Sequence, residues 1–165
     1  MNDIGSSIAA CCKQLRLSSN LAEQAMIQKG DTAQEYLLNL LNNEIAYRHA
    51  CRRTKQLNTA GFPRRYEKSE FRTDEIDFPE GVSFESLLNL DFYHQGKNII
   101  MYGGTGTGKT MLSILIGISA CNQEVPVKFY RTAGLINLFS ESKSRGTLSQ
   151  LKKKLNAAAL LLLAA

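Results

Sequence analysis

The sequence lacks the features of several protein classes. Its four cysteines, at positions 11, 12, 51 and 121, have none of the spacings of metal ligands, and only two histidines are present. The last nine residues are all Ala or Leu, whereas a membrane-spanning helix needs about 20 apolar residues. The N-terminus, with Asp3 early and no long apolar run, is not a signal peptide. These absences disfavour a zinc module, a disulfide scaffold and a membrane protein, and we expect a cytoplasmic protein with reduced thiols.

Acidic residues are outnumbered, because 20 Lys and Arg face 15 Asp and Glu, a net charge of +5. The excess is concentrated in residues 48–68 and 141–154. Such patches suit a nucleic-acid backbone, but solvated helix ends are an equally good interpretation from charge alone. The candidate DNA contacts are Arg48, Arg52, Arg53, Arg64 and Arg65, with Lys152, Lys153 and Lys154 as a weaker second patch.

One glycine-rich stretch carries the chemistry. Residues 103–110, Gly-Gly-Thr-Gly-Thr-Gly-Lys-Thr, match the phosphate-binding loop pattern G-x-x-x-x-G-K-[ST] at every fixed position. Glycines let the backbone approach a polyphosphate closely, and the helix that follows favours an anion at its N-terminus. We therefore expect ATP with Mg²⁺, Lys109 being the catalytic candidate and Thr110 the Mg²⁺ ligand. The predicted nucleotide contacts are Gly103, Gly104, Thr105, Gly106, Thr107, Gly108, Lys109, Thr110 and Met111.

The first 60 residues predict a small helical domain. Short helices are expected over 4–16 and 20–28, with Ser18-Ser19 between them as a cap. Thr32 and Glu35 form a capping-box pattern that should begin a long helix, which Gly61 and Pro63 should end. Residues 61–82 are rich in charge, Gly and Pro, and predict a linker exposed to proteases.

The rest of the chain predicts an α/β nucleotide-binding core over residues 83–165. Ser83 should cap a short helix, and Asn98–Tyr102 should form a buried strand before the phosphate loop. The order strand, loop, helix, strand, helix, strand is that of a P-loop core with a parallel sheet. This order ends at about the third strand, so we expect a truncated core. Beyond the loop helix, we expect strands at 125–130 and 160–163 and helices at 132–143 and 148–155.

Several short segments, taken in their order along the chain, are informative beside the phosphate loop, which is common to many NTPases. They are Leu21–Ala25, Glu35–Leu41, Ala60–Pro63 and Phe84–Leu87 before the loop and Leu135–Leu138 after it. Together they resemble one family, the IstB-like helper ATPases of bacterial insertion sequences, which are relatives of the DnaC-type helicase loaders in the AAA+ class. The resemblance implies a helical domain followed by an AAA+ core. It also implies an oligomer that binds ATP and duplex DNA and assists a transposase in target selection.

The chain departs from this family at its end. The resemblance implies a Walker B pair, Asp-Glu, where Ala164-Ala165 stand. Asp would hold Mg²⁺ and Glu would polarise the attacking water, so the enzymatic activity of the chain as written is uncertain. The run 156–165 holds one Asn and then only Ala and Leu. Either it stands in for residues whose side chains were not identified, which we prefer, or the natural residues were replaced.

Two other functions stay open at this point. A DnaC-like helicase loader would share the core and use the helical domain to grip a helicase rather than DNA. A small-molecule P-loop kinase is disfavoured, because about a hundred residues precede the loop.

Overall fold

The computed structural model describes residues 4–74 and 76–164. The chain forms two compact units, Met1–Arg52 and Arg53–Ala165. The division falls within helix α3, Ala33–Thr59, rather than at the predicted boundary near residue 60. The reason is that Leu57 and Ala60 pack in the core of the second unit.

The first unit contains α1, Ile4–Gln14, α2, Ser19–Ile27, and the first part of α3. The predicted caps are confirmed. The Ser18 hydroxyl accepts a hydrogen bond from the Leu21 amide at 3.2 Å, and Thr32 accepts one from the Glu35 amide at 3.1 Å. The Glu35 carboxylate accepts in return from the Thr32 amide, which completes the capping box. Buried Cys12, Leu21 and Leu40 form the core of this unit.

A buried carboxylate joins α2 to α3. The side chain of Glu44 is only 5% exposed, and its oxygens accept from the Ser18 amide at 2.9 Å, the Ser18 hydroxyl and Arg48 Nε at 2.6 Å. Burial by itself would raise the pKa of Glu44, but the hydrogen bonds from Ser18 and the charge of Arg48 hold that pKa below its ordinary value. Arg48 also donates to the carbonyl of Arg16 at 2.7 Å, so three segments converge on this network.

Removing the Glu44 charge should destabilise the first unit. Glu44→Gln removes the negative charge that faces Arg48 and replaces one of the two acceptor oxygens by an NH₂ donor, so Arg48 and Ser18 cannot all keep their bonds. We expect a loss of about 2 kcal/mol in the free energy of unfolding, measured with urea. Because the pKa of Glu44 is lower in the folded protein than its ordinary value of 4.5, its carboxylate stabilises the fold at pH values above 4.5. This stability is lost as the pH falls below 4.5 through the lowered pKa. The wild type should therefore lose more stability between pH 6 and pH 3 than Glu44→Gln does. Equal pH dependence in the two proteins would contradict the assignment.

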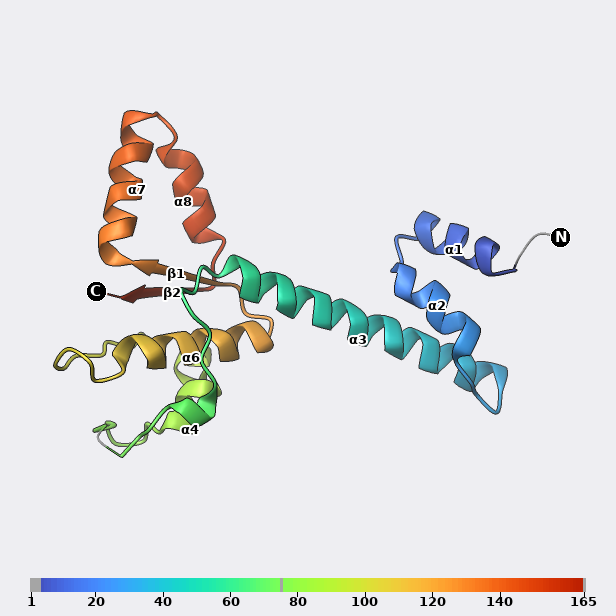
Figure 1. Ribbon diagram of the computed structural model, residues 1–165, viewed down its shortest axis with the longest axis horizontal. Helices are drawn as coiled ribbons and strands as arrows, with labels where there is room; N and C mark the ends of the chain where they lie inside the picture. The colour runs from blue at the N-terminus through green and yellow to red at the C-terminus, as the bar shows by residue number, and fades with distance from the viewer. Residues whose placement is uncertain (1–3, 75, 165) are drawn as a thin grey trace. The chain divides into compact units, whose positions relative to one another are not determined.

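The second unit is a mixed α/β structure with a small parallel sheet. Strand β1, Val127–Arg131, pairs with β2, Leu160–Ala164, in a register that runs from Val127↔Leu160 to Arg131↔Ala164. Helices α7, Thr132–Ser144, and α8, Leu148–Asn156, form the connection between the strands. Helix α6, Lys109–Asn122, contacts both strands, and it lies on the opposite side of the sheet from α7 and α8 (Figure 1).

The prediction of a strand over Asn98–Tyr102 is wrong in this structure. The segment has no regular structure, and the side chains of Ile100 and Tyr102 are 89% and 94% exposed. An extended segment becomes a strand only when a neighbour satisfies its backbone groups. In the described residues the sheet has two strands, and a cavity of about 780 Å³ is lined by both residues 96–101 and β2.

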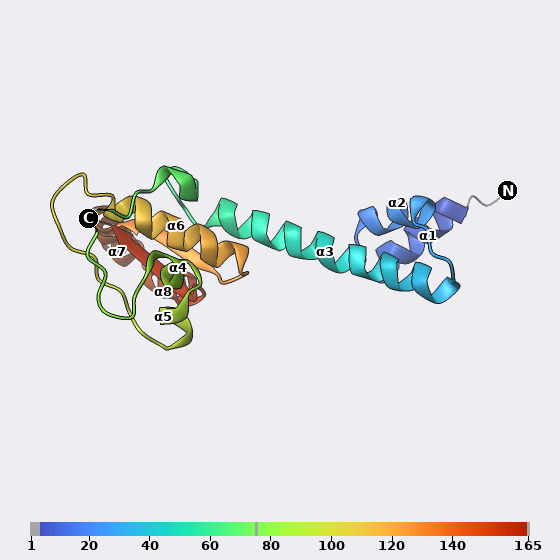
Figure 2. The same ribbon diagram turned by 90° about the horizontal axis from the view of Figure 1, so that it is seen from below.

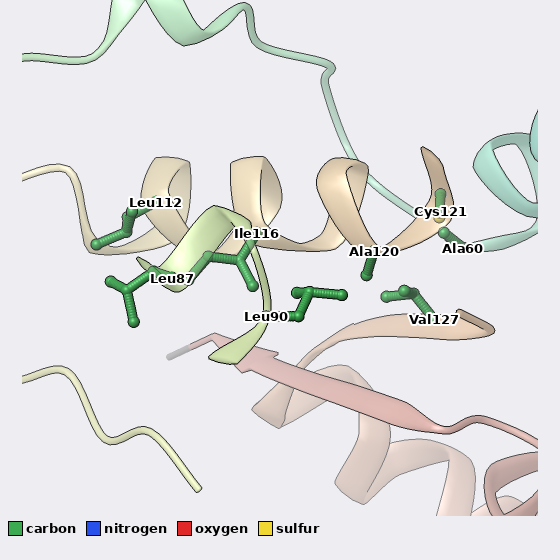
Figure 3. Packing of buried hydrophobic residues seen from close by; sticks show 8 residues of the cluster. All are labelled: Ala60, Leu87, Leu90, Leu112, Ile116, Ala120, Cys121 and Val127. Atoms are coloured by element: carbon green, nitrogen blue, oxygen red, sulfur yellow. The ribbon is translucent and has the colours of Figure 1, made fainter. Parts of the chain in front are cut away.

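The core of the second unit lies between α6, the short helix α4, Phe84–Leu88, and β1 (Figure 3). The predicted cap of α4 is confirmed, because the Ser83 hydroxyl accepts from the Ser86 amide at 3.1 Å. A further helix, α5, Asp91–His94, and a 3₁₀ turn, η1, Lys68–Glu70, were not predicted. The buried side chains that meet in Figure 3 are Ala60, Leu87, Leu90, Leu112, Ile116, Ala120, Cys121 and Val127.

Segment 61–82 is attached to this core. It is irregular apart from η1, but the rings of Phe62, Phe71 and Phe78 are partly buried against the core cluster. Three phenylalanine rings thus anchor a segment that the sequence predicts to be an exposed linker. Figure 2 shows the same elements from below. Among the described residues, no helix is long and apolar enough to cross a membrane.

Helix α6 packs against β2 and Phe62 at Gly117. A Cβ built there would lie 2.7 Å from Leu162 Cδ1 and 2.7 Å from Phe62 Cε1, well inside van der Waals contact. A side chain at residue 117 would therefore require the ends of the Leu162 and Phe62 side chains to shift.

Candidate nucleotide-binding site

The phosphate loop is a tight turn that ends at the N-terminus of α6. Gly106 and Gly108 have φ angles of 84° and 82°, in the left-handed region that residues with a Cβ rarely adopt. Gly108 is the residue that precedes the helix, and its carbonyl accepts the first helical hydrogen bond, from the Leu112 amide at 2.8 Å. The loop glycines thus fold the chain back so that the helix starts directly beneath the turn.

The first turn of α6 supplies the groups that an anion needs. The amides of Lys109, Thr110 and Met111 precede the first helical hydrogen bond and have no partner within the helix. The partial positive charge of the helix N-terminus adds to them. An oxyanion placed at this turn would therefore be bound by backbone N–H groups, as the sequence predicts.

The Lys109 ammonium lies inside the loop. Its Nζ donates to the carbonyls of Gly103 at 2.9 Å and Gly104 at 2.5 Å, and to Thr107 Oγ1 at 3.1 Å. The Thr107 hydroxyl also donates to the Gly104 carbonyl at 3.0 Å. The only side-chain cation of the loop is thus held where the curled backbone would surround a phosphate.

The residues present fit a polyphosphate better than they fit a metal ion. Thr110 is exposed at the start of α6 and can offer its hydroxyl to Mg²⁺. Lys109, Thr110 and Ala164 line the same cavity of about 780 Å³, which contains no Asp or Glu among its described lining residues. When bound with ATP, Mg²⁺ would neutralise charge on the phosphate oxygens. Thr110 would then hold the ion through its hydroxyl, without a carboxylate among the described lining residues.

The last residue of β2, Ala164, stands at the position where the family resemblance implies the Asp of the Walker B pair. Ala164 lines the cavity beside Lys109 and Thr110, and its carbonyl accepts from the Thr132 hydroxyl at 3.1 Å. Thr132 is the first residue of α7, as the predicted helix over 132–143 implies. Position 165, where Glu was expected, lies outside the described residues.

The candidate DNA-binding residues have different surroundings. Arg48 is held by Glu44, Arg64 pairs with Glu70 at 2.9 Å and lies over the Tyr66 ring, and Arg65 donates to Asn58 at 2.6 Å. Arg48 and Arg52 belong to the first unit, whereas Arg53, Arg64 and Arg65 belong to the second. The lysines of α8, Lys152, Lys153 and Lys154, are exposed and pair with no acidic group in the described part of the chain.

An aromatic residue beside the phosphate loop was not predicted. A Cβ on Gly108 would lie 3.1 Å from Phe71 Cε2, so the ring of Phe71 contacts the loop at the start of α6. Phe71 in turn stacks on Phe84, with ring centroids 5.2 Å apart and planes 20° from parallel. In the sequence Phe71 stands alone among charged neighbours, and this pattern does not indicate what the ring contacts.

The comparisons with known proteins agree with the loop geometry. The model of the IstB-like ATP-binding protein family matches residues 10–165. The chain belongs to this family. Because the match covers both units, it includes the helical segment as well as the nucleotide site of the IstB-like chain.

Individual relatives of this IstB-like chain come from insertion sequences. It is 30% identical over 122 residues to the putative ATP-binding protein of IS232 from Bacillus thuringiensis subsp. berliner, which covers 72% of the chain and 48% of that protein. It is 28% identical over 147 residues to the corresponding protein of IS21 from Pseudomonas aeruginosa, which covers 87% and 54%. The putative ATP-binding protein of IS5376 from Geobacillus stearothermophilus is 30% identical over 126 residues. The chain spans about half the length of these relatives.

Proposed function

We propose that this chain is the nucleotide-binding part of a AAA+ helper ATPase that acts with a transposase on duplex DNA and contributes to target selection. The observation that carries the proposal is the phosphate loop at the start of α6 in a chain matched to the IstB-like family over residues 10–165. The relatives are named as putative ATP-binding proteins of insertion sequences, and these names support nucleotide binding in the context of transposition. An AAA+ protein of this kind is expected to act as an oligomer.

The DNA-binding part of the proposal rests on the charge of α8. Lys152, Lys153 and Lys154 are consecutive, exposed and not neutralised by a described acidic partner, so they are available to phosphates. Arg48, Arg64 and Arg65 already have partners within their own units. We therefore give the α8 lysines more weight than their sequence alone suggested.

A salt series on duplex DNA tests this proposal. With ATP present, Lys153→Ala/Lys154→Ala should weaken binding to random-sequence duplex DNA. It should also reduce the slope of log K against log salt by about 0.9 for each lost phosphate contact, or about 1.8 for two. The measurement is fluorescence anisotropy with a labelled duplex at several salt concentrations.

The control for this experiment is a pair of lysines elsewhere. Lys13→Ala/Lys29→Ala removes the same charge from exposed positions of the first unit and should change the slope little. An equal loss of slope in both variants would mean that only net charge matters. An unchanged slope in the α8 variant would remove α8 from the DNA surface.

A helicase loader remains the second candidate, because one observation favours a protein partner. The α3 side chains Leu37, Leu38, Leu41 and Ile45 are all exposed by 45% or more, which is unusual for a helix that contacts only solvent and DNA. On this hypothesis DNA affinity is weak in the wild type as well as in both lysine variants.

A further inference from the structure

The ammonium of Lys109 is bound by three oxygens of its own loop. Its Nζ donates to the carbonyls of Gly103 at 2.9 Å and Gly104 at 2.5 Å and to Thr107 Oγ1 at 3.1 Å. A lysine ammonium has three N–H donors and no acceptor, so these three partners use its whole hydrogen-bonding capacity. A phosphate oxygen can therefore hydrogen-bond to Lys109 only by replacing one of them.

One of the three acceptors depends on the identity of a side chain. The carbonyls of residues 103 and 104 belong to the backbone and are present whatever residues stand there. The third acceptor is present because residue 107 is Thr. The loop pattern G-x-x-x-x-G-K-[ST] leaves this position open, so a hydroxyl here is not part of the general phosphate-binding motif.

The Thr107 side chain joins the start of the loop to its end. Its hydroxyl donates to the Gly104 carbonyl at 3.0 Å, and the same oxygen accepts from Lys109. A Cβ built on Gly103 would lie 3.5 Å from Thr107 Oγ1, and one built on Gly104 would lie 3.8 Å from Thr107 Cγ2. The side chain thus lies close to both glycines, on the side of the turn where the ammonium is held.

We propose that Thr107 is a positioning residue that holds the Lys109 ammonium against the carbonyls of the loop and so competes with phosphate for this cation. The proposal rests on the proposed function, because it needs phosphates bound at residues 103–110. A phosphate that takes the place of Thr107 Oγ1 breaks the bond between Oγ1 and Nζ. The free energy of that bond therefore opposes nucleotide binding.

Thr107→Val tests the proposal, because valine is β-branched like threonine and lacks the hydroxyl. We expect the dissociation constants of ATP and of inorganic tripolyphosphate to fall about fivefold, since a hydrogen bond to a charged group no longer opposes binding. Both ligands should gain equally, because the competition concerns only their phosphates. Calorimetry on the full chain measures both affinities.

Two matched controls come from the same loop. Thr107→Ser keeps the hydroxyl and removes only a methyl group, so it should bind both ligands as the wild type does. Thr105→Val removes a hydroxyl that is not among the three described partners of Lys109, and it should also leave both affinities unchanged. Thermal unfolding of each variant shows whether it keeps the fold.

A double-mutant cycle separates an effect through Lys109 from a general change in the loop. If Thr107 acts through the ammonium, Thr107→Val should strengthen tripolyphosphate binding in the wild-type background and have no effect in a Lys109→Ala background. An equal gain in both backgrounds would overturn the proposal, because Thr107 would then act on the loop itself.

The remaining outcomes can also be told apart. Weaker binding of both ligands by Thr107→Val would overturn the proposal, because the hydroxyl would then assist phosphate binding rather than compete with it. Unchanged affinity would overturn it as well, because the bond to Lys109 would then not oppose binding. If Lys109→Ala alone left tripolyphosphate binding intact, the phosphate site itself would be misassigned and the proposed function would fail instead.

Discussion

Lys109→Ala is expected to lower the affinity for ATP by roughly a hundredfold, because it removes the only side-chain cation of the loop. In the structure the Lys109 ammonium is already within hydrogen-bonding distance of Gly103, Gly104 and Thr107, inside the turn that would surround the phosphates. In the variant only the backbone amides at the start of α6 would remain to bind the phosphates, and they carry no full positive charge. Calorimetric titration with ATP measures the change.

The control for this variant must separate lost charge from lost structure. Lys143→Ala removes one positive charge from exposed α7, far along the chain from the loop, and should leave the affinity for ATP unchanged. Because Lys109 also bonds to the loop, the melting temperature of Lys109→Ala should be recorded. Wild-type affinity in a folded Lys109→Ala protein would refute the assignment of the phosphate site.

The second large effect concerns Mg²⁺ and hydrolysis. With Ala164 at the end of β2, the described residues that line the cavity offer Mg²⁺ the Thr110 hydroxyl but no carboxylate, so the chain should hydrolyse ATP very slowly and gain little ATP affinity from Mg²⁺. Ala164→Asp places a carboxylate in the cavity that Lys109 and Thr110 also line. We expect Mg²⁺, compared with EDTA, to strengthen ATP binding to Ala164→Asp by about tenfold more than to the parent chain.

Ala164→Asn is the matched control, because it adds nearly the same volume without the charge. It should respond to Mg²⁺ as the parent chain does. Brisk hydrolysis by a protein verified to carry Ala164 and Ala165 would contradict the role given to these positions. Equal Mg²⁺ dependence in the Asp and Asn variants would show that residue 164 does not face the metal.

Features that depend on neighbours in the sequence were predicted well. The caps at Ser18, Thr32 and Ser83 each satisfy an amide three residues away, so a short pattern suffices to identify them. The phosphate loop is of the same kind, because its glycines, its lysine and the start of α6 are contiguous. Because the signals that begin and end a helix are also local, the longer helices were predicted with small errors at their ends, whereas the four-residue α5 was not predicted.

Features that depend on distant partners were missed. The segment 98–102 has the composition of a strand, but no described neighbour pairs with it. Glu44 looks like a surface residue of an amphipathic helix, yet it is buried because Ser18 lies 26 residues away in sequence and beside it in space. Phe71 contacts Gly108, 37 positions further on, and no periodicity in the sequence encodes that contact.

The close packing at Gly117 has a consequence for the nucleotide site. Helix α6 is a stiff rod, so the contact of its middle with Leu162 and Phe62 fixes how far its first turn lies from the sheet. Thr110 stands seven residues before this contact on the helix, and Ala164 stands two residues after Leu162 on β2. The spacing between the first turn of α6 and the end of β2 therefore depends on a contact that includes no residue of the phosphate loop. A methyl group at residue 117 would therefore have to displace the ends of the Leu162 and Phe62 side chains or move α6 away from β2, and both changes leave the sequence of the loop the same.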